Sequence, residues 1–284
     1  MIYSSPDDWD KAGFKRVLLF GMSGLGKTHV SNMLRESGSW FHYSIDYRIG
    51  TRYMGEYIVD NFKAEAMKIP FLANLLRTDS IYIASNLTFE NLAPLSTYLG
   101  KPGDLAQGGL PFDEYQNRQA QHHTAEVAAL HDTAHFIDRA RRLYGYQNFV
   151  CDSGGSICEV VDPDDPNDEV MNTLAQNLLL VWIKGSAEHQ EQLVRRFDAN
   201  PKPMCYRSDF LIQTWLAFLS KNKVSADKVD PDEFVRFAYR RALDARQPRY
   251  EAMSRNWGVS VAAEDIARVK SPAEFDTLIR QALE

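Results

Sequence analysis

The sequence predicts an α/β fold in three layers, with a parallel sheet of about five strands between two layers of helices. Two patterns lead to this prediction. Short apolar runs alternate along the chain with longer amphipathic segments, which is typical of parallel strands joined by crossover helices. One of these runs, NLLLVWI at residues 177–183, is almost continuously apolar, as expected for a strand that is buried on both faces.

Five runs have the composition of strands. They are residues 15–21, 39–45, 147–151, 177–183 and 258–262. The first run ends at Gly21, the second leads into Asp46, and the third leads into Asp152. Because ligands of open α/β sheets bind where the carboxyl ends of the strands meet, we expect these three positions to converge on one site.

The stretch between the first predicted strand and the next helix carries the most specific motif. Residues 17–28 read VLLFGMSGLGKT and contain the pattern G-x-x-x-x-G-K-T. The glycines let backbone N–H groups point at one anion, the lysine reaches the terminal phosphates of a nucleotide, and the threonine hydroxyl ligates Mg²⁺. A following helix, about residues 27–36, directs its positive end at the same phosphates. The predicted nucleotide-binding residues are Gly21, Ser23, Gly24, Leu25, Gly26, Lys27, Thr28 and His29, and we expect Lys27 to face solvent.

Composition excludes several other classes of protein. The chain has 284 residues, is 44% hydrophobic and carries a net charge of −6, so we expect a globular core and no nucleic-acid partner. No apolar run approaches the roughly 20 residues of a membrane span, and the first residues do not have the pattern of a signal peptide. Three cysteines without metal-type spacing indicate reduced thiols and a cytoplasmic location.

The chain between the second and third predicted strands is too long for one crossover helix. Residues 53–77 have a helical pattern broken at Pro70, residues 78–111 are rich in Asn, Gly and Pro, and residues 112–144 form a long helical pattern. We expect residues 53–146 to form a helical insertion within a single domain of residues 1–284. It would line or cover a small-molecule pocket, with Gly100, Gly103, Gly108 and Gly109 as flexible points. A homo-oligomer interface is the alternative.

With the strands placed, the chain resembles shikimate kinase and, more broadly, the small-molecule P-loop kinases. Four pieces carry the resemblance besides the GMSGLGKT loop. They are Asp46-Tyr47-Arg48-Ile49-Gly50 after the second strand, DSGGS at 152–156, the strand LLLVWIKGS with an arginine-bearing stretch after it, and RRALDARQPRYEAM at 240–253 followed by WGVSVAAEDI. The resemblance covers residues 15–52 and 147–284.

The resemblance implies roles for particular residues. Asp46 would orient or deprotonate the acceptor hydroxyl, Gly154 and Gly155 would let the substrate approach the backbone, and Arg246 would contact the substrate. Residues 187–210 would contain the lid, with Lys202 or Arg207 as its cation, and Pro248 would break or start a helix. Arg48 and Arg52 could hold an anionic acceptor, since arginine suits carboxylate and phosphate.

The chain also departs from the family pattern. Of the two acids in the family's D-x-D segment, the first is Ser44 here and only Asp46 remains. Asp152, at the end of the third strand, is the candidate to replace the missing carboxylate near Mg²⁺, together with Thr28. Alternatives stay open for each residue: Asp46 can be a helix cap, and the arginines can be surface ion-pair residues.

These observations together predict a kinase that uses ATP and Mg²⁺ to phosphorylate a hydroxyl of a small metabolite, with an anionic compound as one candidate. Lys27, Asp46 and Arg246 are the predicted catalytic residues. The alternative is an ATPase, or a nucleotide-dependent switch or scaffold that binds a partner through the insertion.

Overall fold

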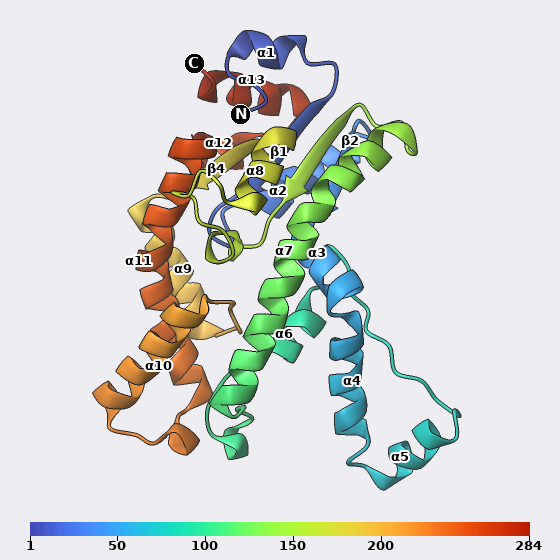
Figure 1. Cartoon of the computed structure of the whole chain (residues 1–284), viewed down its shortest axis with the longest axis vertical. Coiled ribbons are helices and arrows are strands. Elements are labelled where there is room, and N and C mark those ends of the chain that lie inside the picture. The colour runs from blue at the N-terminus through green and yellow to red at the C-terminus, as the bar shows by residue number, and fades with distance from the viewer.

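A five-stranded, fully parallel sheet forms the centre of the molecule (Figure 1). The computed structural model describes residues 1–284. The strands are β1 (Lys15–Phe20), β2 (Trp40–Ser44), β3 (Asn148–Asp152), β4 (Leu179–Lys184) and β5 (Gly258–Ala262), in the spatial order β2-β3-β1-β4-β5. The five predicted strands are therefore confirmed to within two residues at each end. Residues 17–20 of β1 and 179–181 of β4 are fully buried, as their apolar runs require.

Helices cover both faces of the sheet. Because parallel crossovers are right-handed, α2 lies on one face of the sheet, while α7, α8 and α11 lie on the other. Their bounds are α2 (Lys27–Glu36), α7 (Phe112–Arg142), α8 (Glu169–Asn177) and α11 (Pro231–Trp257). The helices α12 (Ala263–Arg268) and α13 (Pro272–Ala282) follow β5, and α1 (Pro6–Lys11) packs on α13 near both chain ends (Figure 1).

The chain between β2 and β3 is mostly helical, with a long irregular stretch at residues 78–92. It contains α3 (Ile45–Arg48), a π-helical turn (Ile49–Tyr53), α4 (Gly55–Ala66), α5 (Pro70–Arg77), α6 (Ala93–Leu99), a 3₁₀ turn (Leu105–Gln107) and α7. Helices α4 and α5 extend away from the sheet as an arm, while α7 runs along most of the length of the molecule (Figure 1). The expected break at Pro70 is confirmed, since α5 begins at this residue.

Two of the glycines expected to give flexibility are in fact tightly packed. The N–H of Gly103 donates to Leu110, and the next N–H, of Asp104, donates to the carbonyl of Val229 at 2.8 Å. A Cβ on Gly103 would collide with the Val229 carbonyl oxygen, and one on Gly109 would collide with the backbone of Gly103. This loop therefore joins the β2–β3 segment firmly to the residues before α11.

The chain between β4 and β5 forms a helical layer. It comprises α9 (Ala187–Ala199), α10 (Ser208–Asn222), a 3₁₀ turn (Ala226–Lys228) and α11. The expectation that Pro248 breaks or starts a helix is wrong, because α11 continues through it to Trp257. Packing of Leu243, Tyr250 and Met253 in the core outweighs the loss of one backbone hydrogen bond.

None of the helices combines the length and the apolar composition that crossing a membrane would require.

The packing of Gly103 predicts a stability effect at this junction. Gly103→Ala should lower the free energy of unfolding by about 2 kcal/mol or more, because the backbone has a φ of 142° and the new Cβ meets a carbonyl. Gly108→Ala is the matched control, since this glycine also has a positive φ but no atom within 4 Å of the added Cβ. Urea unfolding measures both. An equal loss of unfolding free energy in the two variants would show that the close packing of Gly103 against Val229 does not stabilise the fold.

Candidate functional site: a phosphate loop facing two carboxylates

The phosphate loop connects β1 to α2 at the carboxyl edge of the sheet. Gly21, Gly24 and Gly26 have φ values of 135°, 89° and 93°, which residues with a side chain rarely adopt. A Cβ on Gly21 would also lie 2.7 Å from the Ile183 carbonyl oxygen of β4. The motif therefore specifies a local backbone shape, and α2 begins directly after it at Lys27.

Lys27 folds back onto its own loop. Its Nζ donates to the carbonyl oxygens of Gly21 at 2.8 Å and Met22 at 2.9 Å, and the residue is buried with 7% of its surface exposed. The expectation that it faces solvent is therefore wrong, because the nearest acceptors belong to the loop itself. Burial lowers the pKa of Lys27 to about 8, although the charges of Asp152 and Asp46 act in the opposite direction.

Asp152 ends β3 directly beside the loop. The Thr28 hydroxyl donates to Oδ2 of Asp152 at 3.1 Å. The other oxygen of Asp152, Oδ1, is buried without a hydrogen bond and lies 3.2 Å from Nε2 of His42, a contact that becomes an ion pair only if the imidazole is protonated. An oxygen of Asp152 and the oxygen of Thr28 thus lie together, with a further oxygen still free to accept.

Asp46 lies across the same pocket, in the first turn of α3 after β2. Its carboxylate approaches the turn after β3 so closely that a Cβ on Gly154 would lie 2.5 Å from its Oδ1. Burial, together with the charge of Asp152, raises the pKa of Asp46 to about 6, while Lys27 acts to lower it. Such a carboxylate is mostly ionised at neutral pH yet remains a competent base.

The pocket between these groups has a volume of about 270 Å³. Its lining combines the loop and the ends of β2 and β3 with two residues of the β2–β3 segment. It comprises Ser23, Gly24, Gly26, Lys27, Thr28, His29, Ser44, Asp46, Phe89, Leu92, Asp152, Ser153, Gly154 and Gly155. Of the predicted nucleotide-binding residues, Gly21 and Leu25 shape the loop from behind without lining the pocket.

Phe89 and Leu92 were missed by the analysis of the sequence. The Phe89 ring stacks on His42 and packs on Tyr47, with ring centroids 4.8 and 4.7 Å apart, and the Arg35 guanidinium lies over it. The sequence of residues 78–92 has neither a helical nor a strand pattern. The only indication that Phe89 and Leu92 would reach the pocket was their place in the chain between the second and third predicted strands.

The predicted substrate arginines do not line this pocket. Arg48 pairs with Asp132 of α7 at 2.7 Å, and Arg52 borders a separate surface hollow beside α4. Arg246 is fully buried, where its Nε donates to Glu159 at 2.6 Å and its Nη2 to the Cys205 carbonyl. Burial opposes the charge of Arg246, but Glu159 outweighs it and the pKa is raised. Arg48 and Arg246 thus have their polar partners away from the pocket, and Arg52 is exposed at the surface.

The predicted lid is anchored at its end. The Met204 carbonyl accepts from Tyr115 and Gln119, and the Tyr206 N–H donates to Gln119. These bonds tie residues 200–207, the strap between α9 and α10, to α7. Arg207 lies 3.4 Å from Glu159 and 3.8 Å from Asp209. Lys202 is exposed and has no ion-pair partner, and neither Lys202 nor Arg207 lines the P-loop pocket.

The turn after β3 is held by Tyr250 and Ser156, which belong to the motifs that carry the resemblance, and by Glu126, which lies outside those motifs. The Tyr250 hydroxyl donates to the Gly155 carbonyl at 2.5 Å, and the Ser156 hydroxyl donates to Glu126 of α7 at 2.9 Å. Glu126 is fully buried, and burial followed by the charge of Asp46 raises its pKa to about 8. Its neighbour His122 is also buried, which lowers its pKa to about 4. Both groups are therefore largely uncharged at neutral pH.

Comparison with known proteins finds no matching family and a weak similarity to a solved structure. No family model matches the chain, and no curated protein matches it. Among solved structures, the chain is similar to shikimate kinase from Bacteroides thetaiotaomicron, with 13% sequence identity, 94% of this chain and 95% of that chain covered, and a TM-score of 0.40. This similarity is too weak to assign any chemistry, so the chemistry of the site is argued from the residues of this chain.

The buried Glu126 predicts a pH-dependent stability. Its pKa rises from 4.5 to about 8 on folding, so its stabilising contribution is complete below pH 4.5 and is lost as pH rises to 8. The free energy of unfolding of the wild type should fall relative to that of Glu126→Gln by up to about 1.4 kcal/mol per pH unit in this window. Glutamine keeps an acceptor for Ser156.

Urea unfolding at a series of pH values tests this prediction, with the exposed Glu191→Gln as the control. Parallel stability curves for the wild type and Glu126→Gln would show that Glu126 does not take up a proton on folding.

Proposed function

We propose that the protein transfers the γ-phosphoryl group of ATP to a hydroxyl group of a small molecule. The observation that carries the proposal is the convergence of Thr28, Asp152 and Asp46 around the phosphate loop, with the Thr28–Asp152 hydrogen bond of 3.1 Å on one side and Asp46 on the other. A nucleotide-phosphate site alone needs no second carboxylate, whereas a kinase needs one near the acceptor hydroxyl.

The residues present fit Mg²⁺ and a nucleotide. The threonine and carboxylate oxygens are the ligands that Mg²⁺ prefers, and the buried Oδ1 of Asp152 has no hydrogen bond to give up. When bound, Mg²⁺ neutralises charge on the phosphates. Lys27 and the N–H groups of residues 23–28 would hold the phosphate oxygens once the lysine leaves its two carbonyl acceptors, an exchange that its position beside the pocket allows.

The chemical step assigns one role to each group. The acceptor oxygen forms a bond to the γ-phosphorus, the bond from that phosphorus to the β–γ bridging oxygen breaks, and ADP leaves. The proton of the acceptor hydroxyl passes to the carboxylate of Asp46. Because the pKa of Asp46 is about 6, the rate should fall as pH drops below that value.

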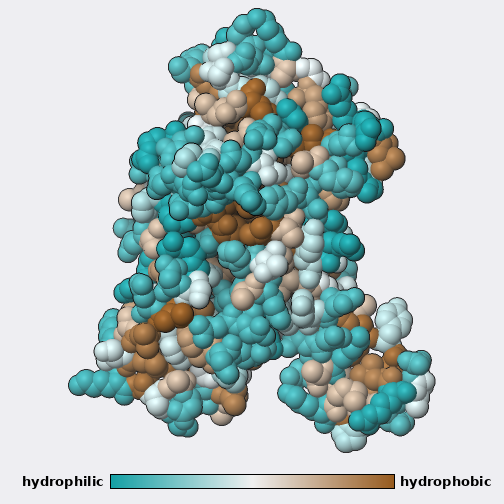
Figure 2. Space-filling model, viewed as in Figure 1, coloured by the Kyte–Doolittle hydropathy of each residue, from teal (hydrophilic) through white to brown (hydrophobic).

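Nucleotide-dependent binding of a partner is the second candidate. The arm exposes Met67, Ile69 and Phe71 around α5 and Tyr82 after it, and Phe71 has 71% of its surface exposed. Figure 2 shows this apolar colouring on the lobe at the lower right, which is the arm of Figure 1. Exposed apolar side chains on a projecting element are typical of a protein-binding surface. An ATPase, in which water replaces the acceptor, is the third reading.

Asp46→Asn separates these candidates. The variant should bind ATP as the wild type does, because Lys27 and the loop are intact, but should lose acceptor-dependent ADP release by about 10²- to 10⁴-fold. The measurement is ADP release from Mg-ATP with and without a protein-free filtrate of small metabolites. Lys27→Ala is the comparison variant and should lose nucleotide binding itself.

The outcomes distinguish the readings. Equal ADP release with and without the filtrate would indicate an ATPase, and a full rate in Asp46→Asn would make Asp46 a helix cap. A third outcome would favour nucleotide-dependent binding of a partner. In this outcome the protein binds nucleotide without turnover, and the arm captures a protein only when nucleotide is bound.

A further inference from the structure

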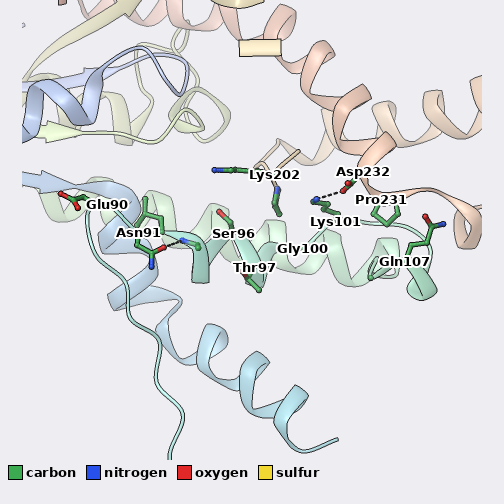
Figure 3. A pocket seen from close by; sticks show the side chains of 14 residues that line it. Glu90, Asn91, Ser96, Thr97, Gly100, Lys101, Gln107, Lys202, Pro231 and Asp232 are labelled. Carbon is green, nitrogen blue, oxygen red and sulfur yellow. Dashed lines mark hydrogen bonds and ion pairs between the residues drawn. The ribbon is translucent and has the colours of Figure 1, made fainter. Parts of the chain in front are cut away.

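One stretch of the arm is extended but belongs to no sheet. Residues 81–87, with the sequence IYIASNL, follow α5 without a turn, a bend or a helix, and every φ angle among them is negative. Figure 1 shows the stretch as a long trace beside α4, and Figure 3 shows the same trace leading to Glu90. We call residues 81–87 the free strand.

The backbone of the free strand makes no hydrogen bond within the chain. The nearest backbone bonds lie just outside it, where the Ser80 N–H donates to Leu75 and where Thr88 and Asn91 bond to each other. No side chain bonds to this backbone either, since the side-chain bonds of Ser80 and Thr88 also stay outside it. A row of unpaired N–H and C=O groups is a template on which another strand can pair.

Side chains hold the free strand in its extended shape. Tyr82, Ala84 and Asn86 are exposed, and the residues between and beside them are half-buried or buried. This period of two is that of a strand with one face packed on the protein. At its end, Leu87 is buried so closely against Gly50 that a Cβ on this glycine would lie 3.1 Å from it. Because the strand is ordered in the single chain, pairing costs less conformational entropy.

The free strand lacks the features by which proteins protect an open edge. Edge strands are usually guarded by charged side chains, by proline or by a bulge, whereas residues 80–89 contain no charged residue and no proline. On the side of α4, Ala84 and Ser85 border a hollow of about 880 Å³. The strand otherwise lies at the margin of the molecule (Figure 1). No other strand of the chain therefore pairs with either edge.

The charges at its two ends favour a second copy of the chain as the partner, in antiparallel orientation. Arg77 precedes the strand, Glu90 follows it, and neither has an ion-pair partner. Antiparallel pairing centred on Ala84 sets exposed residues opposite exposed residues and brings Arg77 of each copy to the end where Glu90 of the other lies. Parallel pairing would bring like charges together. Asp79, in the turn before the strand at a φ of 52°, offsets part of the attraction, so charge sets the direction and backbone pairing supplies most of the binding energy.

We propose that two copies of the chain associate through their free strands, which form a two-stranded antiparallel ribbon with twofold symmetry. The N–H and C=O groups along the outer edge of each strand bond to those of the other copy. A ribbon of this length is marginal by itself, and Ile69, Phe71 and Tyr82 of the same arm add exposed apolar surface. This inference does not depend on the proposed kinase function.

Sedimentation velocity of the full chain, at concentrations from about 1 to 100 µM, tests the inference. The wild type should form a dimer as concentration rises. Ala84→Pro and Ser85→Pro each remove one N–H, and neighbouring N–H groups of a strand point to opposite edges. At least one of the two variants should therefore raise the dissociation constant of the dimer by about tenfold or more. Ala84→Ser and Ser85→Ala, which keep the N–H, are the matched controls and should dimerise as the wild type does. Because neither N–H is bonded in the single chain, the proline variants should keep the wild-type circular dichroism.

Amide hydrogen exchange locates the interface without any substitution. The N–H groups of residues 81–87 should exchange rapidly at low concentration, and those at alternate positions should be protected by about tenfold or more once the dimer forms. A chain that stays monomeric over the whole range would overturn the inference. A dimer whose residues 81–87 exchange as rapidly as those of the monomer would also overturn it, since such a dimer forms through another surface. Wild-type dimerisation by both proline variants would lead to the same conclusion.

Discussion

The alignment of three strand ends is the constraint on which the site depends. In the register of the sheet, Asp152 of β3 pairs with Leu19 of β1 on one side and with Ser44 of β2 on the other. The three strands therefore end at the same level. The phosphate loop follows β1, Asp46 follows β2, and Asp152 is the last residue of β3. The hydrogen bond from Thr28 to Asp152 joins the loop to its neighbouring strand. A slip of one residue in either pairing would turn Asp152 away from the loop.

The charged groups at this edge influence one another strongly because they are shielded from water. Lys27 faces the carboxylates of Asp46 and Asp152. Burial, followed by the charge of Asp152, raises the pKa of Asp46, while Lys27 acts to lower it. Glu126 lies behind the same turn and adds no further charge at neutral pH, since its pKa is about 8. The site is thus able to accept positive charge, such as a divalent cation, and to take up a proton at Asp46.

The sequence predicted the sheet and the phosphate loop well because both are encoded locally. Apolar runs define the strands, and the loop glycines define a backbone shape that needs no distant partner. The arginines were placed less well, since the position of a long side chain depends on partners such as Asp132 for Arg48 and Glu159 for Arg246. Phe89, Leu92 and Glu126 could not be foreseen, because only the folded path of the β2–β3 segment brings them to the site. Pro248 shows the same limit, as tertiary packing keeps α11 intact around it.

Calorimetric titration of ADP with and without Mg²⁺ into the wild type and Asp152→Asn tests the central claim most directly. The variant keeps an oxygen to accept from Thr28 but loses the carboxylate charge. We expect Mg²⁺ to strengthen ADP binding to the wild type, and this gain to fall by about tenfold or more in Asp152→Asn, with metal-free ADP affinity retained. An equal gain from Mg²⁺ in both proteins would contradict the account of Thr28 and Asp152 as the metal-binding side of a nucleotide site.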